Sequence, residues 1–421
     1  MFTFFPRIFI TRGKENVTVI QYLLPKVTGK TTSMIKLIVS IFIVALLANI
    51  THAKVRGESR TERLASKILA EERELLIYLP NNYQQNTTLN YPVLFLLDGQ
   101  RNFAHAAGTL DLLNQSNMAQ EMIIVAILNT HRTRDFTPTY DQSYNQWGIS
   151  GGADNFLDFI EQELIPYVNK QYRTNHFKIL SGHSLGGLLS IYALQSRPKL
   201  FQAYFAFSPS LWWHDQIIFK DAKNFLTRTA TLHKYLYINM GNEGGHMLST
   251  FERYKQLLKE HAPKNLAFNA ELNTAENHNT TALVGHSLAY RYLNTTLQAP
   301  KDVVANGIPA IEQFFKTQSE KYAYQSIPSY RAINRAGYNA LNKKDFATAI
   351  KIFEANVKTY PHKADAYDSL ADGLEANGDL NNALKARGLA ITKSSSENVE
   401  SNAFKTRYVN LLNSITEKNA N

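Results

Sequence analysis

The sequence of 421 residues contains no cysteine. Disulfide bonds, thiolate metal sites and a cysteine nucleophile are therefore excluded, and any nucleophile must be Ser, Thr, Lys or a carboxylate. Glycine (20 residues) and proline (13 residues) are too scarce for a collagen-like or low-complexity chain. Hydrophobic residues make up 44% of the chain, which is too many for a disordered protein. The length is sufficient for two or three domains with buried cores.

Long runs of basic residues are also absent. The formal net charge is +10, from 45 Lys and Arg against 35 Asp and Glu. Half of this excess falls in residues 1–53, which hold six Lys or Arg and one Glu. Because a nucleic-acid-binding surface needs a concentrated basic patch, the sequence predicts no nucleic-acid partner.

Residues 34–53 have the pattern of a secretory signal peptide. Lys36 is followed by an apolar stretch at residues 37–50 and by the small residue Ala53. The stretch is shorter than the roughly 20 residues of a membrane span, and an uncleaved anchor is the alternative. We expect residues 1–53 to be a leader cleaved after Ala53. We expect translation to begin at Met34, the preceding residues being a gene-start artefact. The mature protein would be periplasmic or secreted, with no stable membrane span.

Short apolar runs alternate with amphipathic stretches over residues 54–300. The runs predict strands at residues 75–79, 93–97, 122–128, 177–180, 204–207, 236–240 and 266–272. Helical spacing predicts helices at residues 156–168, 188–194 and 247–261. Strands that alternate with helices are typical of a parallel sheet with helices on its faces. We therefore predict one α/β domain at residues 54–300 with a mostly parallel sheet.

The last ninety residues have a purely helical pattern with an internal repeat. Asp345 and Asp379, like Ala349 and Ala383, stand 34 positions apart, which is the tetratricopeptide period. The small alanine lets the two helices of a unit approach closely. A plain helical hairpin is the alternative, since only some consensus positions match.

We predict a small tetratricopeptide-like domain at residues 329–415, behind a linker at residues 301–328 that contains a helix. Two repeats are fewer than a free-standing solenoid needs. They should therefore pack on the α/β domain, on a protein partner or on a terminal helix at residues 403–412.

The string G-H-S-L-G at residues 182–186 lies between a predicted strand and a predicted helix. In that context G-x-S-x-G forms a tight turn that exposes the serine, and the flanking glycines leave room for the backbone. We predict the α/β-hydrolase fold, with Ser184 as the nucleophile. The amide of Leu185, at the start of the helix, is a predicted oxyanion donor.

A second oxyanion donor is expected from the loop after the strand at residues 93–97. Gly99 permits a tight turn there, and the Gln100 amide follows it. For Asp98 we favour a turn-capping role over catalysis.

An α/β-hydrolase orders its triad along the chain as serine, acid and histidine. Glu243 follows the strand at residues 236–240 and is the predicted acid, and His278 follows the strand at residues 266–272 and is the predicted base. Less direct candidates for these two roles are Asp215, Asp221, His246 and His286.

With these residues in place, the chain resembles the putative-esterase family of α/β-hydrolases, which is related to esterase D and the siderophore esterases. It is most similar to bacterial hydrolases with a tetratricopeptide tail. The matching strings lie at residues 96–99, 129–138, 182–187, 208–213 and 276–278. The resemblance implies hydrolysis of a carboxylic ester with no metal and no organic cofactor. It leaves the substrate open among acyl, thioester, feruloyl and siderophore trilactone esters.

Four residues are candidates for substrate contact. Arg132 and Arg134 follow a strand at the sheet edge where ligands bind, and could clamp an anionic or catecholate group. An ion pair of Arg134 with Asp135 that shapes the loop is the alternative. Trp212 and Trp213 could wall an aromatic or acyl pocket or pack in the core.

We therefore predict an exported serine esterase that acts on a small-molecule ester, such as a siderophore, aryl or acyl ester. Two alternatives stay open. The same triad could transfer the acyl group to an acceptor other than water, or the protein could be a scaffold that binds a protein partner through its helical tail.

Overall fold

The computed structural model describes residues 57–81, 83–87, 89–322, 327–394 and 399–420. The chain divides into two units, Met1–Lys54 and Val55–Asn421, and the structure below is that of the second. The predicted signal peptide and its cleavage position after Ala53 lie outside the described residues. No helix in the described part of the chain is both long and apolar enough to cross a membrane.

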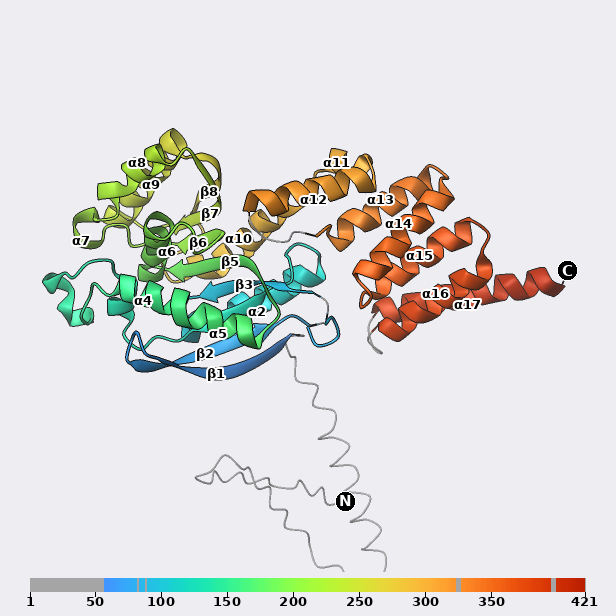
Figure 1. Ribbon diagram of the computed structural model, residues 1–421, viewed down its shortest axis with the longest axis horizontal. Helices are drawn as coiled ribbons and strands as arrows, with labels where there is room; N and C mark the ends of the chain where they lie inside the picture. The colour runs from blue at the N-terminus through green and yellow to red at the C-terminus, as the bar shows by residue number, and fades with distance from the viewer. Residues whose placement is uncertain (1–56, 82, 88, 323–326, 395–398, 421) are drawn as a thin grey trace, which may run out of the picture. The chain divides into compact units, whose positions relative to one another are not determined.

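The described strands form one sheet with the order β1-β2-β4-β3-β5-β6-β7-β8 (Figure 1). They are β1 (Glu58–Ser66), β2 (Glu71–Leu79), β3 (Tyr91–Leu96), β4 (Ile123–Ile127), β5 (Thr174–His183), β6 (Ala203–Phe207), β7 (Thr231–Gly241) and β8 (Lys264–Asn273). β2 pairs antiparallel with β1 and β4, and the other neighbours pair parallel. The predicted α/β fold with a mostly parallel sheet is confirmed. β1 was not predicted, because its largely polar sequence contains no apolar run.

The central strands are buried on both faces, which explains their continuous apolar runs. In β3, Val93 and Phe95 belong to one hydrophobic cluster, whereas Leu94 and Leu96 belong to the cluster on the opposite face. Successive side chains of a strand point to opposite faces, so a strand between two helical layers needs apolar residues at every position.

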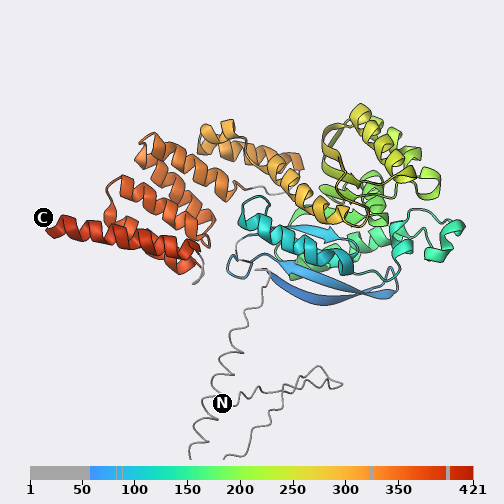
Figure 2. The same ribbon diagram turned by 180° about the vertical axis from the view of Figure 1, so that it is seen from behind.

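Helices cover both faces of the sheet. Those of the α/β domain are α2 (Gly99–Gln115), α3 (Arg132–Phe136), α4 (Ala153–Phe159), α5 (Ile165–Gln171), α6 (Leu185–Ser196), α7 (Trp213–Gln216), α8 (Phe219–Arg228), α9 (Gly245–His261) and α10 (Thr281–Leu297), with the short turns η1 (Gln142–Trp147) and η2 (Ile160–Leu164). α4 and α5 lie in front of the sheet in Figure 1. α2 lies in front of it in Figure 2, which shows the molecule from behind.

The segment predicted as a linker with a helix packs against the α/β domain. It contains α11 (Lys301–Ala305) and α12 (Ile308–Tyr322). The ring of Tyr322 stacks on Tyr235 of β7, with ring centroids 4.5 Å apart. Phe315 is buried in a cluster with Ile333 of the next helix. These contacts join the sheet to the C-terminal helices.

The C-terminal region is helical, as predicted. Its helices are α13 (Tyr330–Asn342), α14 (Phe346–Thr359), α15 (Ala364–Ala376), α16 (Leu380–Lys393) and α17 (Val399–Ala420). Asp345 and Asp379 cap α14 and α16 in the same way, each accepting a hydrogen bond from the amide three residues ahead. Ala349 and Ala383 are both fully buried. The local structure thus repeats at 34 residues, while the tetratricopeptide assignment stays a prediction.

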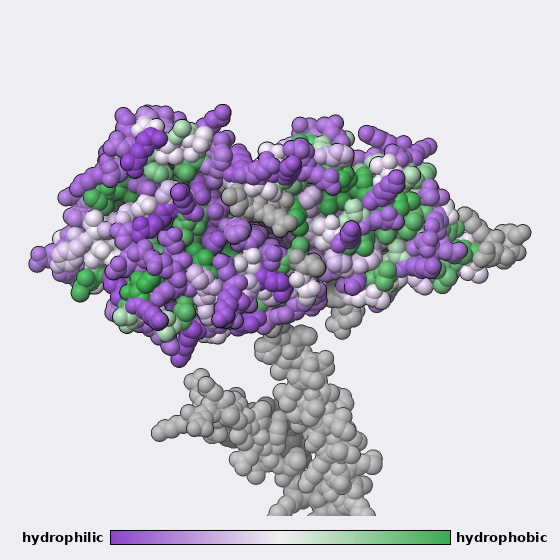
Figure 3. All heavy atoms as spheres, in the orientation of Figure 1, coloured by the Kyte–Doolittle hydropathy of each residue, from purple (hydrophilic) through white to green (hydrophobic). Residues whose placement is uncertain are grey.

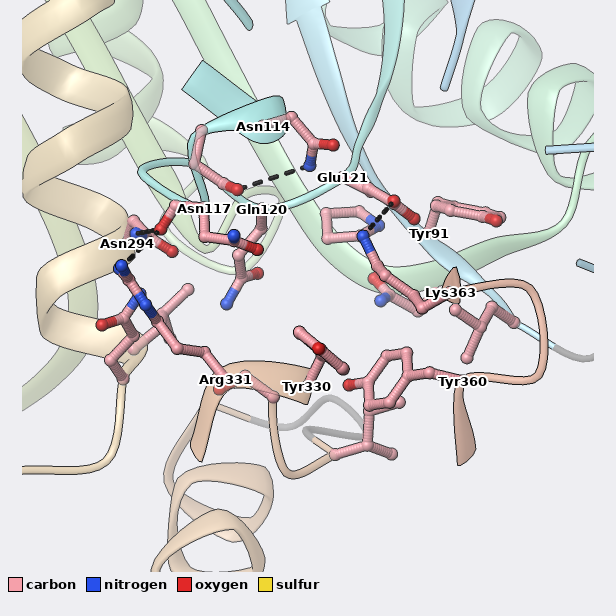
Figure 4. Close-up of a pocket in the computed structure, with 18 of the residues that line it drawn as sticks. Tyr91, Asn114, Asn117, Gln120, Glu121, Asn294, Tyr330, Arg331, Tyr360 and Lys363 are labelled. Atoms are coloured by element: carbon pink, nitrogen blue, oxygen red, sulfur yellow. Dashed lines mark hydrogen bonds and ion pairs between the residues drawn. The ribbon is translucent and has the colours of Figure 1, made fainter. Parts of the chain in front are cut away.

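These helices contact the α/β domain around a pocket shown in Figure 4. Lys363 forms an ion pair with Glu121 at 3.5 Å, and Arg331 donates to the backbone carbonyl of Asn117 at 3.3 Å. Hydrophilic residues cover most of the face in Figure 3, with hydrophobic patches among them. Ser184, Glu243 and His278 are not among the residues that line the pocket in Figure 4, so this pocket is separate from the predicted catalytic residues.

The two halves of the tail carry different residues at a position with a left-handed backbone conformation. Lys344 and Gly378 follow α13 and α15 at equivalent places and have φ angles of 62° and 83°. A lysine in this conformation costs roughly 1 kcal/mol more than a glycine. Lys344→Gly is therefore expected to raise the melting temperature of the tail, and Gly378→Ala to lower it. Thermal unfolding followed by circular dichroism measures both, and a lower melting temperature for Lys344→Gly would contradict the expectation.

Candidate active site

The chain turns sharply between β5 and α6, with Ser184 at the turn. Ser184 has φ of 59° and ψ of −116°, a conformation that residues other than glycine rarely adopt. A Cβ atom on Gly182 would collide with the backbone of Gly186 in the first turn of α6. Glycine at position 182 therefore allows the strand and the helix to approach closely enough to form this turn.

Two further side chains, from separate loops, form a hydrogen-bond chain with Ser184. His278 lies between β8 and α10, and its Nε2 is 3.1 Å from Ser184 Oγ. Glu243 lies between β7 and α9, and its Oε2 is 2.6 Å from His278 Nδ1. Nδ1–H donates to the carboxylate, which leaves Nε2 to accept the hydroxyl proton of Ser184. The structure thus brings together the residues predicted as nucleophile, base and acid.

Ser208 is a further member of this network that was not predicted from the sequence. It is fully buried after β6, and its hydroxyl donates to Oε1 of Glu243 at 2.6 Å. Burial raises the pKa of the Glu243 carboxyl group, but hydrogen bonds with His278 and Ser208 outweigh burial and hold the pKa below its ordinary value. The carboxylate is therefore ionised at neutral pH and fixed at both oxygens.

Ser210 is a second serine beside the turn. Its Oγ lies 3.2 Å from Ser184 Oγ, and its amide donates to the backbone carbonyl of Ser184 at 3.1 Å. Ser208 and Ser210 belong to the string S-P-S that directly follows a predicted strand. Polar residues at the carboxyl end of a buried strand were the sequence signal that could have identified them.

A pocket of about 350 Å³ opens at Ser184. Its lining residues are Asp98, Gln100, Arg101, Asn129, Arg132, His183, Ser184 and His278. Leu185 and Gln100 occupy the first turns of α6 and α2, where backbone amides have no partner within the helix. Such amides are suited to binding negative charge.

Arg132 lines this pocket but is already bonded to protein groups. Its Nε and Nη2 are 2.6 Å and 3.0 Å from the two carboxylate oxygens of Asp98. Its Nη2 also donates to the backbone carbonyl of His183 at 3.2 Å. Asn129 donates to the same carboxylate at 2.6 Å. Asp98 is thus the centre of a buried polar network.

Arg134 lies in an ion cluster, which favours the structural alternative for this residue. It contacts Glu71 and Asp135, each at 2.8 Å. The buried guanidinium of Arg73 also contacts both of these carboxylates. The cluster links the segment after β4 to β2. The guanidinium of Arg134 is bound to carboxylates of the protein.

Neither Trp212 nor Trp213 is among the residues that line the pocket at Ser184. Trp213 is fully buried in the hydrophobic core and cannot wall an open substrate pocket, so the predicted substrate contact is wrong for this residue. Trp212 is half-buried and donates its indole N–H to the sulfur of Met247 at 2.9 Å. It contacts the rings of Tyr144 and Trp147, which form an aromatic cluster beside α3.

The less direct candidates for acid and base lie elsewhere. Asp215, Asp221 and His246 are on α7, α8 and α9. His286 is fully buried in α10, where it contacts Ser181 and the carbonyl of Ala282. Within the described part of the chain, no group of three or more His, Asp or Glu side chains is placed to hold a metal ion.

His183 supports the loop that carries His278. Its Nε2–H donates to the backbone carbonyl of His278 at 2.6 Å. Burial lowers the pKa of His183 to about 4, so the ring is neutral at physiological pH. His105 and His286 pack against each other nearby, and burial lowers their pKa values as well.

These buried neutral histidines predict a pH-dependent stability. Below about pH 6.5 the unfolded chain binds protons at His105, His183 and His286 that the folded state does not bind. The free energy of unfolding should therefore fall as the pH drops from 6.5 toward 4, by up to about 1.4 kcal/mol per pH unit for each such histidine. Urea unfolding at pH 7.5 and pH 5 measures this. His183→Gln keeps the donor to His278 and should reduce the slope. Equal stability at both pH values would contradict the expectation.

The chain is similar in sequence to known esterases. The siderophore triacetylfusarinine C esterase of Aspergillus fumigatus is 33% identical over 199 residues, which cover 44% of this chain and 66% of that protein. The ferri-bacillibactin esterase BesA of Bacillus subtilis is 29% identical over 177 residues, covering 38% and 61%. The matched regions thus span slightly less than two thirds of these relatives.

Among solved structures, a serine hydrolase is similar to this chain in sequence and fold. An IroE-like serine hydrolase from Shewanella oneidensis is 29% identical with a TM-score of 0.63, covering 72% of this chain and all of that chain. The family model described as "Putative esterase" matches residues 66–293, more than half of the sequence. The chain therefore belongs to the putative-esterase family.

Proposed function

We propose that this protein is a carboxylic ester hydrolase with Ser184, His278 and Glu243 as its catalytic residues. The observation that carries the proposal is the hydrogen-bond chain from Ser184 Oγ to His278 Nε2 at 3.1 Å and from His278 Nδ1 to Glu243 at 2.6 Å. This is the arrangement that activates a serine hydroxyl as a nucleophile. Membership of the esterase family and the esterase relatives support the same activity.

The geometry supports a two-step reaction. His278 takes the proton of Ser184 as the oxygen attacks the ester carbonyl, and then donates it to the leaving alcohol. Glu243 keeps the imidazole in the required tautomer and stabilises its protonated form. Water, deprotonated by His278, then releases the acid from Ser184. The amides of Leu185 and Gln100 would stabilise the oxyanion of each tetrahedral intermediate, and one such donor contributes about a hundredfold to a thousandfold in rate.

For the substrate we propose a siderophore ester or a related aryl or acyl ester. One relative is named a siderophore esterase, and another is named a ferri-bacillibactin esterase. A second pocket adjoins the first at Arg132 and includes Trp147 and Ile149, which are 53% and 71% exposed. Exposed aromatic and aliphatic side chains beside the catalytic pocket favour a substrate with a large apolar or aromatic group.

We also propose that the protein is exported and that its tail binds a protein. Export rests on the signal-peptide pattern at residues 34–53, and the tail proposal on the repeat of the capped helices α14 and α16. Leu389, Val409 and Leu412 are 47%, 51% and 40% exposed on α16 and α17. These exposed apolar side chains are available for contact with a protein partner.

Replacing the nucleophile tests the proposed activity. Ser184→Ala should abolish labelling by a fluorophosphonate probe and lower the turnover of 4-nitrophenyl butyrate by at least about a thousandfold. Ser287→Ala is the matched control, because Gly285-His286-Ser287 repeats the tripeptide G-H-S inside α10. It should keep both labelling and turnover. Activity that persists in Ser184→Ala would contradict the proposal.

A substrate panel tests the proposed ester class. We expect kcat/KM to be higher for a catecholate trilactone than for short acyl, thioester and feruloyl esters, because a larger substrate would contact both adjoining pockets. Product acids and product esters are measured with and without an added alcohol, with Ser184→Ala as the blank. A preference for short acyl esters would contradict the substrate proposal. Ester products in place of acids would indicate acyl transfer.

A further inference from the structure

Arg132 connects three loops that meet at the catalytic pocket. It is the first residue of α3, in the segment after β4, and it contacts both the loop after β3 and the turn after β5. Building on the proposed esterase function, we propose that Arg132 is a positioning residue that holds the two oxyanion amides in register with Ser184, and that it is not a clamp for an anionic substrate.

The loop after β3 needs an external support. Asp98 precedes α2 with φ of 55° and ψ of 47°, in the left-handed region. Its side chain makes no capping hydrogen bond to α2. Instead its carboxylate, on a residue that is only 4% exposed, is held by two N–H groups of Arg132 and by the amide of Asn129. A strained residue persists when its surroundings hold its conformation. Here the hydrogen bonds from Arg132 to the carboxylate provide much of that support.

The same guanidinium reaches the nucleophile turn. Its Nη2 donates to the backbone carbonyl of His183 at 3.2 Å, and that carbonyl belongs to the peptide bond joining His183 to Ser184. Gln100 stands two residues after Asp98, and Leu185 stands two residues after His183. One side chain therefore links the short segments that carry the two proposed oxyanion donors. Its planar, rigid fork makes this link directional.

The contacts argue against a substrate clamp. A clamp offers charge and N–H donors to the ligand, whereas the charge of Arg132 is compensated by the Asp98 carboxylate. Its guanidinium also lies over the ring of Phe136, 5.4 Å from the centroid. The side chain is 34% exposed and borders the pocket, while its Nε and Nη2 donors bind Asp98 and the carbonyl of His183.

The two roles predict different kinetics. A positioning residue acts on the transition state, so its loss lowers kcat for every ester. A clamp binds the ground state of a charged substrate, so its loss raises KM for anionic esters alone. Neutral 4-nitrophenyl acetate and the anionic mono-4-nitrophenyl ester of succinic acid separate these cases.

We expect Arg132→Lys and Arg132→Ala to lower kcat about tenfold to a hundredfold for both esters, with KM changed less than about threefold. Affinity for a boronic acid transition-state analogue should fall by the same factor as kcat, and millimolar guanidinium should partly restore the Arg132→Ala enzyme. Arg197→Lys is the matched control, because Arg197 pairs with Asp158 at 2.7 Å outside the pocket. It should match the unmodified protein.

Asp98→Asn tests the same link from the other partner, so the inference does not depend on one variant folding. It should lower kcat without a selective effect on the anionic ester. The double variant with Arg132→Ala should lose less in kcat than the product of the two single fold-losses. A raised KM for the anionic ester alone, or unchanged kinetics in the Arg132 variants, would overturn the inference. An unmodified protein that hydrolyses neither ester and leaves Ser184 unlabelled would instead overturn the proposed function.

Discussion

The strained backbone at Ser184 is the constraint on which the rest of the site depends. A φ of 59° and a ψ of −116° cost about 1–3 kcal/mol for a serine, so the surroundings must hold the turn in place. The amide of Ser184 donates to Phe207 of β6, and its carbonyl accepts from Leu188 and Ser210. Gly182 removes the one side chain that would collide with the helix. The turn is therefore stabilised from the sheet, from α6 and from the segment after β6.

Parallel pairing of the strands brings these separate segments together at one site. The carboxyl ends of β3, β5, β6, β7 and β8 lie at one edge, so the loops that follow these strands are neighbours in space. Ser184 and His278 are 94 residues apart in the chain, and His278 and Glu243 are 35 apart. The order of the strands in the sheet, and not local folding, brings the two residues of each pair together. The supporting residues Asp98 and Ser208 come from the same edge, which is why polar groups there can be buried and still have partners.

Much of the fold could be predicted from the sequence because its signals are local. Continuous apolar runs marked the strands that are buried on both faces, and a strand–G-x-S-x-G–helix string marked the turn at Ser184. β1 escaped prediction because an edge strand with exposed positions carries charged residues in place of an apolar run. The roles of Arg132 and Arg134 depend on which carboxylate each guanidinium meets. Asp98 and Glu71 lie 34 and 63 residues away from them, so no local pattern could assign those partners.

The sequence by itself determined the apolar strands of the α/β domain, the position of the strained serine and the 34-residue repeat of the tail, since each follows from periodicity or from side-chain size over a few residues. Only the tertiary structure decided that Ser208 holds the far oxygen of Glu243, that Trp213 is core and that Arg132 joins two loops. Those facts depend on the packing of segments that are distant in the chain, and a buried hydrogen bond forms only where that packing brings donor and acceptor within about 3 Å.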